Sequence, residues 1–223
     1  MNTTMERAFT REEYRCSMGT KITALEYYLP EKVLSNKDLE KEFPEWDSSK
    51  TESKIGIRER RVVSKDETAL DLAEKACNKV LDGFDKDLID FVILCTQSPD
   101  YFLPTSACIL QDRLGLSENI GAYDFNLGCS GYIFGLAQAK GLISAGIAKN
   151  VLFVVSETYS KHIFHRDVAN RAIFGDGAAA TIISASEVNQ IHEFSFGTCG
   201  KGWENLIVRN GGMRNPREAE PEE

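Results

Sequence analysis

The chain has 223 residues, of which 42% are hydrophobic and 27% charged, a composition typical of a globular protein with one substantial core. The formal net charge of −8 and the absence of a Lys/Arg-rich run disfavour a nucleic-acid backbone as ligand. No apolar run is long enough for a signal peptide or a membrane span, and the six cysteines show no metal-ligand spacing, so we expect a cytoplasmic protein with free thiols and no metal.

The first 20 residues are polar and are predicted to be an N-terminal extension. Apolar and polar residues begin to alternate only at Lys21, which is typical of a strand. Residues 217–223 are polar and lack periodicity, so they cannot bury enough apolar surface to become ordered. We therefore expect one domain over residues 21–216, between the extension and a disordered acidic tail.

Strands alternate with helices along this domain. Ser35 and Asp38 form a capping signal for a short helix that ends near Phe43. The apolar runs 91–95 and 151–155 lack alternation, which is typical of strands covered on both faces. The other predicted elements are helix 68–81, helix 106–114, strand 120–125 and helix 130–145. This order predicts an α/β fold with a mostly parallel sheet and helices on both faces.

Cys129 lies where strand 120–125 meets helix 130–145. A free cysteine in apolar surroundings is usually a small core residue. Cys129 differs because Gly128 and Gly131 flank it and a helix begins beside it, where unpaired N–H groups and the helix dipole stabilise a thiolate. Cys129 is therefore the candidate nucleophile. The helix that follows has almost no polar face, which predicts that it is buried.

Two competing motifs point to other chemistry. Around Ser130 the sequence fails the G-x-S-x-G pattern of serine hydrolases, because Tyr132 occupies the position of the last glycine. Residues 175–180 match GxGxxA, but residues 181–183 continue as a strand where a dinucleotide-binding fold requires a helix. A serine hydrolase and nicotinamide binding are both disfavoured.

Four separated blocks, in this order, resemble the beta-ketoacyl-acyl-carrier-protein synthase III family of the thiolase-like superfamily. The blocks are residues 56–60, 103–108, 126–132 and 173–178. The resemblance runs from about Lys21 to Pro216 and implies one half, the nucleophile half, of a duplicated thiolase-like αβαβα fold. It also implies that Cys129 accepts an acyl group from acyl-CoA for condensation with malonyl-acyl-carrier protein in fatty-acid or related ketide synthesis. The coenzyme A thioester is then the substrate, and no cofactor is expected.

The resemblance suggests substrate-binding residues as well. Trp46 is expected to stack on the adenine of coenzyme A, and Lys54 lies near a position where the family has a CoA-contacting arginine. Leu103 is expected to shape the acyl pocket, reaching across a dimer interface. Because the carrier protein is acidic, a basic docking patch is also expected, for which Arg166 and Arg171 are candidates.

The chain ends before the histidine and asparagine that the family uses to stabilise the enolate. His162, His165 and His192 do not match that motif and are expected to be solvated loop or edge residues, with a substrate entrance as the alternative for the first two. Impaired condensation is expected, as is a homodimer or association with a second-half polypeptide; a chain alone would be prone to aggregate. A non-catalytic partner subunit, a degenerate fragment and another thiolase-like acyl-CoA synthase stay open as alternatives.

Overall fold

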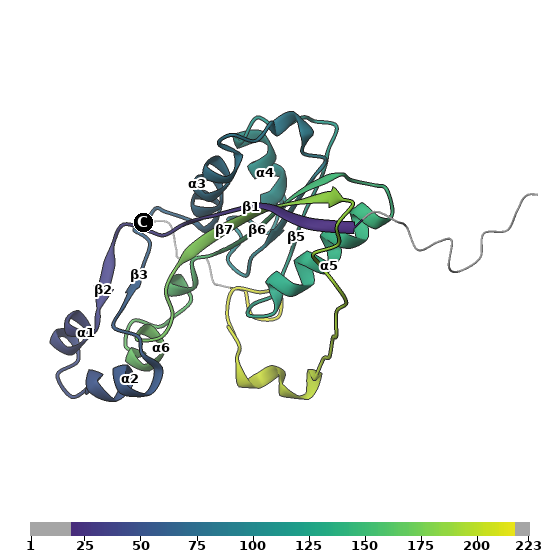
Figure 1. Ribbon diagram of the computed structural model, residues 1–223. Coiled ribbons are helices and arrows are strands. Elements are labelled where there is room, and N and C mark those ends of the chain that lie inside the picture. The colour runs from purple at the N-terminus through teal and green to yellow at the C-terminus, as the bar shows by residue number, and fades with distance from the viewer. Residues whose placement is uncertain (1–18, 217–223) are drawn as a thin grey trace, which may run out of the picture. The chain divides into compact units, whose positions relative to one another are not determined.

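The computed structural model describes residues 19–216 (Figure 1). By its internal contacts the chain divides into two compact units, Met1–His192 and Glu193–Glu223. The predicted acidic tail lies outside the described residues, as does the predicted extension except for its last two residues. Those two residues begin β1 (Gly19–Tyr28), so the first strand starts two residues before the predicted Lys21.

A five-stranded sheet in the order β1-β7-β6-β4-β5 forms the centre of the first unit. Its other strands are β4 (Phe91–Cys95), β5 (Gly121–Phe125), β6 (Asn150–Glu157) and β7 (Gly177–Ser186). Strand β4 pairs in parallel with β5 and β6, whereas β7 is antiparallel to β6 and β1. Four strands thus run in one direction and only β7 in the other, which confirms the mostly parallel sheet.

Helices cover both faces of this sheet, as predicted (Figure 1). Helices α3 (Ala69–Leu81) and α4 (Ser106–Arg113) lie on one face and contact each other, and α5 (Gly131–Ser144) lies on the opposite face. The core between α3, α4 and the sheet consists of fully buried aliphatic side chains, including Leu70, Leu72, Leu110, Val92 and Leu152. Removing their apolar surface from water stabilises the unit and orients the strands that carry the site.

A second, two-stranded sheet pairs β2 (Val33–Ser35) with β3 (Glu59–Arg61). Between them lie α1 (Asn36–Glu42), where the predicted Ser35–Asp38 capping box is formed, and α2 (Ser48–Ile55). Helix α2 was not predicted, because its mainly polar sequence has no apolar stripe. Short helices complete the described part of the chain: α6 (Val168–Arg171), η1 (Lys86–Leu88), η2 (Tyr159–Lys161) and η3 (Gly200–Asn205).

Helix α5 buries only one face, formed by Gly131, Gly135, Leu136, Ala139 and Ile143. On its other side Ile133 is 48% exposed. The prediction that the whole helix is buried is therefore wrong for the described structure. An apolar composition shows that a helix tolerates burial all round, but a single sheet beneath it covers only one face.

Gly135 allows α5 to pack tightly on β6, because a Cβ atom there would lie 2.0 Å from Cζ of the buried Phe153. We expect Gly135→Ala to lower the free energy of unfolding by about 2 kcal/mol, since overpacking forces the helix and sheet apart. Gly141→Ala in the same helix is the matched control. A Cβ atom at Gly141 meets nothing within 4 Å, so this change should raise stability by about 1 kcal/mol. Urea denaturation measures both, and equal stabilities would contradict the prediction.

Candidate active site

The carboxyl ends of three parallel strands lie together at one end of the sheet. Strand β4 leads into Gln97 and Ser98, β5 leads into the turn around Cys129, and β6 ends at Glu157. In open α/β sheets, ligands bind in the crevice outside these ends. The topology therefore brings the predicted nucleophile and three polar residues to the carboxyl ends of the strands, where a ligand is expected to bind.

Cys129 is an exposed residue in a tight turn immediately before α5. The turn is closed by the N–H of Gly131, which donates to the carbonyl of Gly128 at 2.8 Å. Ser130, the N-cap of α5, makes no side-chain hydrogen bond to the helix. Within residues 19–216 no acceptor bonds the backbone N–H of Cys129. The thiol therefore lies beside backbone donors that the fold leaves unused at a helix start.

A second thiol, Cys95 at the end of β4, lies close to this turn. Its Sγ donates to the carbonyl of Leu127 at 3.1 Å. Burial raises the pKa of Cys95 to about 11, and the charge of Glu157 acts in the same direction. Cys95 is therefore a protonated donor that holds the segment before Cys129, whereas Cys129 itself is open to solvent.

Glu157 organises the loop that follows β4. Its carboxylate accepts the Gln97 N–H at 2.5 Å and the Ser98 hydroxyl at 2.8 Å. Burial raises the pKa of Glu157; the two hydrogen bonds partly offset this, and the charge of Asp176 adds to it. Sequence reasoning missed this residue. Its available signal was an acidic residue placed directly at the end of a continuous apolar strand.

His162 belongs to the same cluster. Its Nε2 lies 3.2 Å from Ser98 Oγ and 3.3 Å from the Gln97 carbonyl oxygen, and the residue is half-buried. His162 lies in the loop after β6, as expected, but it is half-buried rather than fully solvated, because the β4 loop packs against it. His165 and His192 are exposed, as expected.

Comparison with known proteins identifies a family that this chain resembles. The family model described as 3-oxoacyl-[acyl-carrier-protein (ACP)] synthase III matches residues 123–200, which contain Cys129 and Glu157. A beta-ketoacyl-[acyl-carrier-protein] synthase III of a Sulfurovum species is 40% identical over 166 residues, 72% of this chain and 47% of that protein. The corresponding protein of Caldanaerobacter subterraneus is 38% identical over 195 residues, 85% of this chain and 57% of that protein.

Solved structures agree as well. One 3-oxoacyl-(acyl-carrier-protein) synthase III superposes with a TM-score of 0.87 at 48% identity, over 90% of this chain and 61% of the other. That of Burkholderia xenovorans gives a TM-score of 0.80 at 35% identity, over 87% and 56%. The chain belongs to the beta-ketoacyl-acyl-carrier-protein synthase III family. Its α/β fold is thiolase-like, and it spans about half the length of the curated synthase III relatives that it matches.

Within this synthase III fold, the block at residues 173–178 has a structural role. Asp176 is only 5% exposed and accepts the N–H of Val63 at 2.8 Å and both the N–H and the hydroxyl of Ser160, at 2.9 and 2.5 Å. Its own N–H donates to the Arg61 carbonyl at 2.8 Å. The block therefore joins the segment after β3 to the loop after β6.

The buried Arg60, in the block at residues 56–60, also joins segments that are distant in the chain. Its guanidinium donates to the carbonyl of Leu34, to Asn36 Oδ1 and to the carbonyl of Ala172, at 2.6 to 2.8 Å. Burial lowers the pKa of Arg60. These bonds hold the two-stranded sheet against the end of α6, so the block that carries the family resemblance connects distant segments.

The residues predicted to bind substrate lie on separate segments. Trp46 is half-buried between α1 and α2, and Lys54 is exposed in the last turn of α2. Leu103 is 86% exposed in the loop before α4, and Arg166 is exposed before α6. No direct contact joins any of them to Cys129, so their roles stay predictions.

Arg171 is already engaged by neighbouring groups. Its guanidinium pairs with both carboxylate oxygens of Glu42, at 2.7 and 2.9 Å, and lies 5.5 Å from the ring centre of Phe43. It also donates to the His165 carbonyl at 2.5 Å. This pairing lowers the pKa of Glu42. Arg171 therefore ties α6 to α1, and its predicted docking role stays untested.

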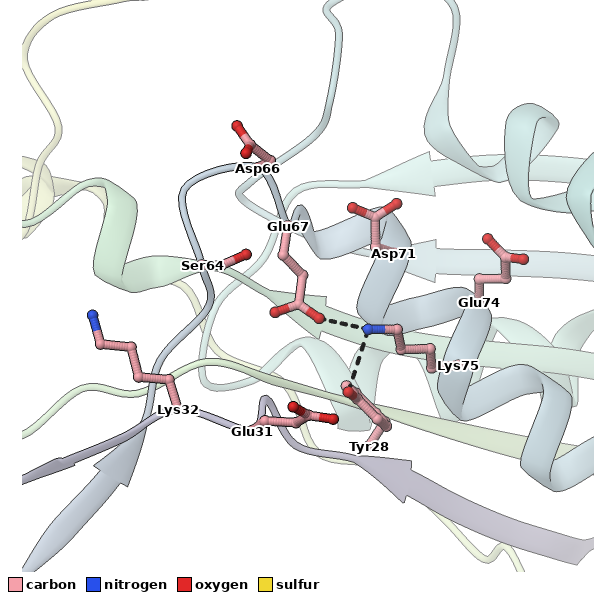
Figure 2. Close-up of a pocket in the computed structure, with 9 residues that line it drawn as sticks. All are labelled: Tyr28, Glu31, Lys32, Ser64, Asp66, Glu67, Asp71, Glu74 and Lys75. Atoms are coloured by element: carbon pink, nitrogen blue, oxygen red, sulfur yellow. Dashed lines mark hydrogen bonds and ion pairs between the residues drawn. The ribbon is translucent and has the colours of Figure 1, made fainter.

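One pocket, of about 690 Å³, does not have Cys129 among its lining residues (Figure 2). It is mainly acidic, with Glu31, Asp66, Glu67, Asp71 and Glu74 among its lining residues. Figure 2 shows Lys75 directed at Glu67 and Tyr28, and its Nζ lies 2.6 Å from the Glu67 carboxylate and 3.3 Å from the Tyr28 hydroxyl. Lys75 thus neutralises one of these acidic groups, Glu67.

A smaller pocket of about 240 Å³ lies between the β2–β3 sheet and the loop after β6, and is lined by Lys32, Leu34, Val62, Val63, Ser160, Ile163, His165, Arg171 and Phe174.

Among residues 19–216, no cluster of three or more His, Cys, Asp or Glu is arranged to hold a metal ion. In the same part of the chain, no helix has the length and apolarity needed to cross a membrane.

Proposed function

We propose that Cys129 accepts an acyl group from acyl-CoA in a reaction of the synthase III type, the first step of condensation with malonyl-acyl-carrier protein in fatty-acid synthesis. The observation that carries this proposal is the exposed thiol in a tight turn, beside unused backbone N–H groups at the start of α5. Membership of the synthase III family supports it.

The turn suits acyl transfer chemically. The Cys129 thiolate attacks the thioester carbonyl, and the unpaired N–H of Cys129 is available to the oxyanion that forms. Collapse of the tetrahedral intermediate breaks the bond to the coenzyme A sulfur, which leaves as a thiolate. The acyl group then remains on Cys129 as a thioester. Splitting the overall condensation into two steps in this way is the advantage of covalent catalysis.

We further propose a homodimer formed through the edge of the sheet at β5. An edge strand presents unpaired N–H and C=O groups to a second strand. Asp124 of β5 accepts the N–H groups of Ser106 and Ala107, both at 2.6 Å, and so holds the start of α4 beside this edge. The preceding Phe102 and Leu103 are 71% and 86% exposed. Burial of these side chains in a dimer is consistent with the proposed role of Leu103 in the acyl pocket.

The remaining substrate contacts follow the family resemblance. Trp46 and Lys54 are proposed to bind coenzyme A. Arg166 is proposed to contact the acidic carrier protein. Within the described residues Arg166 forms no ion pair, so its charge is available to a partner, unlike that of Arg171.

Incubation with acetyl-CoA tests the central proposal. We expect intact-mass measurement to show one acetyl group per chain, and peptide mapping to locate it on Cys129. The other exposed thiols described, Cys108 and Cys199, serve as internal controls. No adduct, or an adduct on either of these two cysteines, would overturn the assignment.

A further inference from the structure

Gln97 connects the end of β6 to the turn that carries Cys129. Its backbone N–H donates to Glu157, and its side-chain Nε2 donates to Asn126 Oδ1 at 3.1 Å. Asn126 directly follows β5 and precedes Cys129 by three residues. One residue on the β4 loop therefore bonds to β6 on one side and to the Cys129 segment on the other.

Gln97 also touches the turn itself. The Gln97 amide rests against the residue before Cys129, because a Cβ atom at Gly128 would lie 2.9 Å from Gln97 Oε1, the end of that side chain. A shift of Gln97 thus changes the support beneath the turn. The orientation of Gln97 depends in turn on Glu157. The Glu157 carboxylate accepts hydrogen bonds from the Gln97 N–H and from the hydroxyl of the next residue, Ser98.

Other contacts also hold the Cys129 turn, among them the hydrogen bonds from Gly131 to Gly128 and from Cys95 to Leu127. Cys95 packs against Gly131 as well, where a Cβ atom would lie 2.4 Å from its Sγ. His162 Nε2 also contacts this loop, at Ser98 Oγ and at the Gln97 carbonyl oxygen. Glu157 accepts two hydrogen bonds from the β4 loop, from Gln97 and Ser98, and is not itself hydrogen-bonded to Cys129.

We propose that Glu157 is a positioning residue for acyl transfer: through Gln97 it fixes the turn that presents Cys129 to the acyl donor. This inference rests on the proposed role of Cys129. A displacement of a reacting group by 1 Å is enough to cost about 100-fold in rate, so a partial loosening of this support has a measurable effect on acylation.

Two rates at Cys129 separate positioning from general damage. Acetylation by acetyl-CoA requires an oriented thiol, whereas alkylation by the small reagent iodoacetamide does not. Glu157→Gln leaves one acceptor oxygen where the Gln97 N–H and the Ser98 hydroxyl now have two, so the two donors compete for it and the support of Gln97 is loosened. We expect acetylation of Cys129 to fall about tenfold with alkylation unchanged.

Asp90→Asn is the matched control. Asp90 likewise accepts two hydrogen bonds, from the N–H groups of Lys149 and Asn150, but at the opposite end of β6. We expect a similar loss of thermal stability and no change in either rate. If Glu157→Gln acetylates like the wild type, or if both of its rates fall together, the positioning role is overturned. If the wild type itself is not acetylated, the proposed function fails instead.

A double-mutant cycle tests the route through Gln97. Gln97→Ala removes the contacts with Asn126 and Gly128, and we expect it to lower acetylation about as much as Glu157→Gln does. Because both changes interrupt one chain of contacts, the double variant should be no slower than either single variant. A normal rate in Gln97→Ala, or a product of the two effects in the double variant, would overturn the inference.

Discussion

Replacing Cys129 by serine is expected to lower acyl transfer from acetyl-CoA on the order of 1,000-fold or more, because an unactivated hydroxyl is a far weaker nucleophile than a thiol. Serine has nearly the same shape, and residue 129 is exposed, so the melting temperature should stay unchanged. The initial rate of acetyl incorporation, followed by mass spectrometry, measures this loss.

Cys108→Ser and Cys199→Ser are the matched controls, since both residues are exposed thiols on other segments of the chain, Cys108 in α4 and Cys199 after β7. Each should acetylate at the wild-type rate. If Cys129→Ser retains its adduct, or if one of the control variants loses it, the acyl-accepting residue is not Cys129.

Asp176→Ala is expected to lower the free energy of unfolding by at least about 3 kcal/mol, because it leaves the N–H of Val63 and both donors of Ser160 without their acceptor. A typical domain has a free energy of unfolding of about 5–15 kcal/mol, so this change removes a large part of it. Chemical denaturation in urea, with the midpoint and slope fitted separately, measures the effect.

Asp176→Asn serves as the graded control. It retains one acceptor oxygen at nearly the same position, so it should lower the free energy of unfolding by less than Asp176→Ala does. A loss of under about 1 kcal/mol in the alanine variant would mean that the three donors find other partners, and that this block does not join the two segments.

Strands 91–95 and 120–125 and the helices around residues 68–81, 106–114 and 130–145 were predictable to within a few residues. Their signals are local, because continuous apolar runs and helical periodicity depend on residues that are close in the chain. Helices α3 and α5 are each followed by a glycine with positive φ, Gly83 and Gly146. The β2–β3 sheet and α2 were missed. Their residues are largely polar, and they are held by distant contacts such as that of Arg60 with Ala172.

The candidate site divides in the same way. The Cys129 turn was predicted, since its glycines and the helix that follows are neighbours in the chain. The connection from Glu157 through Gln97 to Asn126 was not, because it joins residues that are 60 and 29 positions apart. The pairing of Arg171 with Glu42 spans 129 positions and was equally inaccessible.

The sequence by itself thus determined the alternation of elements, the family resemblance and the choice of Cys129, because these depend on side-chain types at short spacing. Only the tertiary structure decided which thiol is exposed, which histidine is half-buried and which carboxylate supports the nucleophile turn. The physical reason is that hydrogen bonds and burial depend on distance in space. Parallel strands bring their carboxyl ends together whatever the length of chain between them.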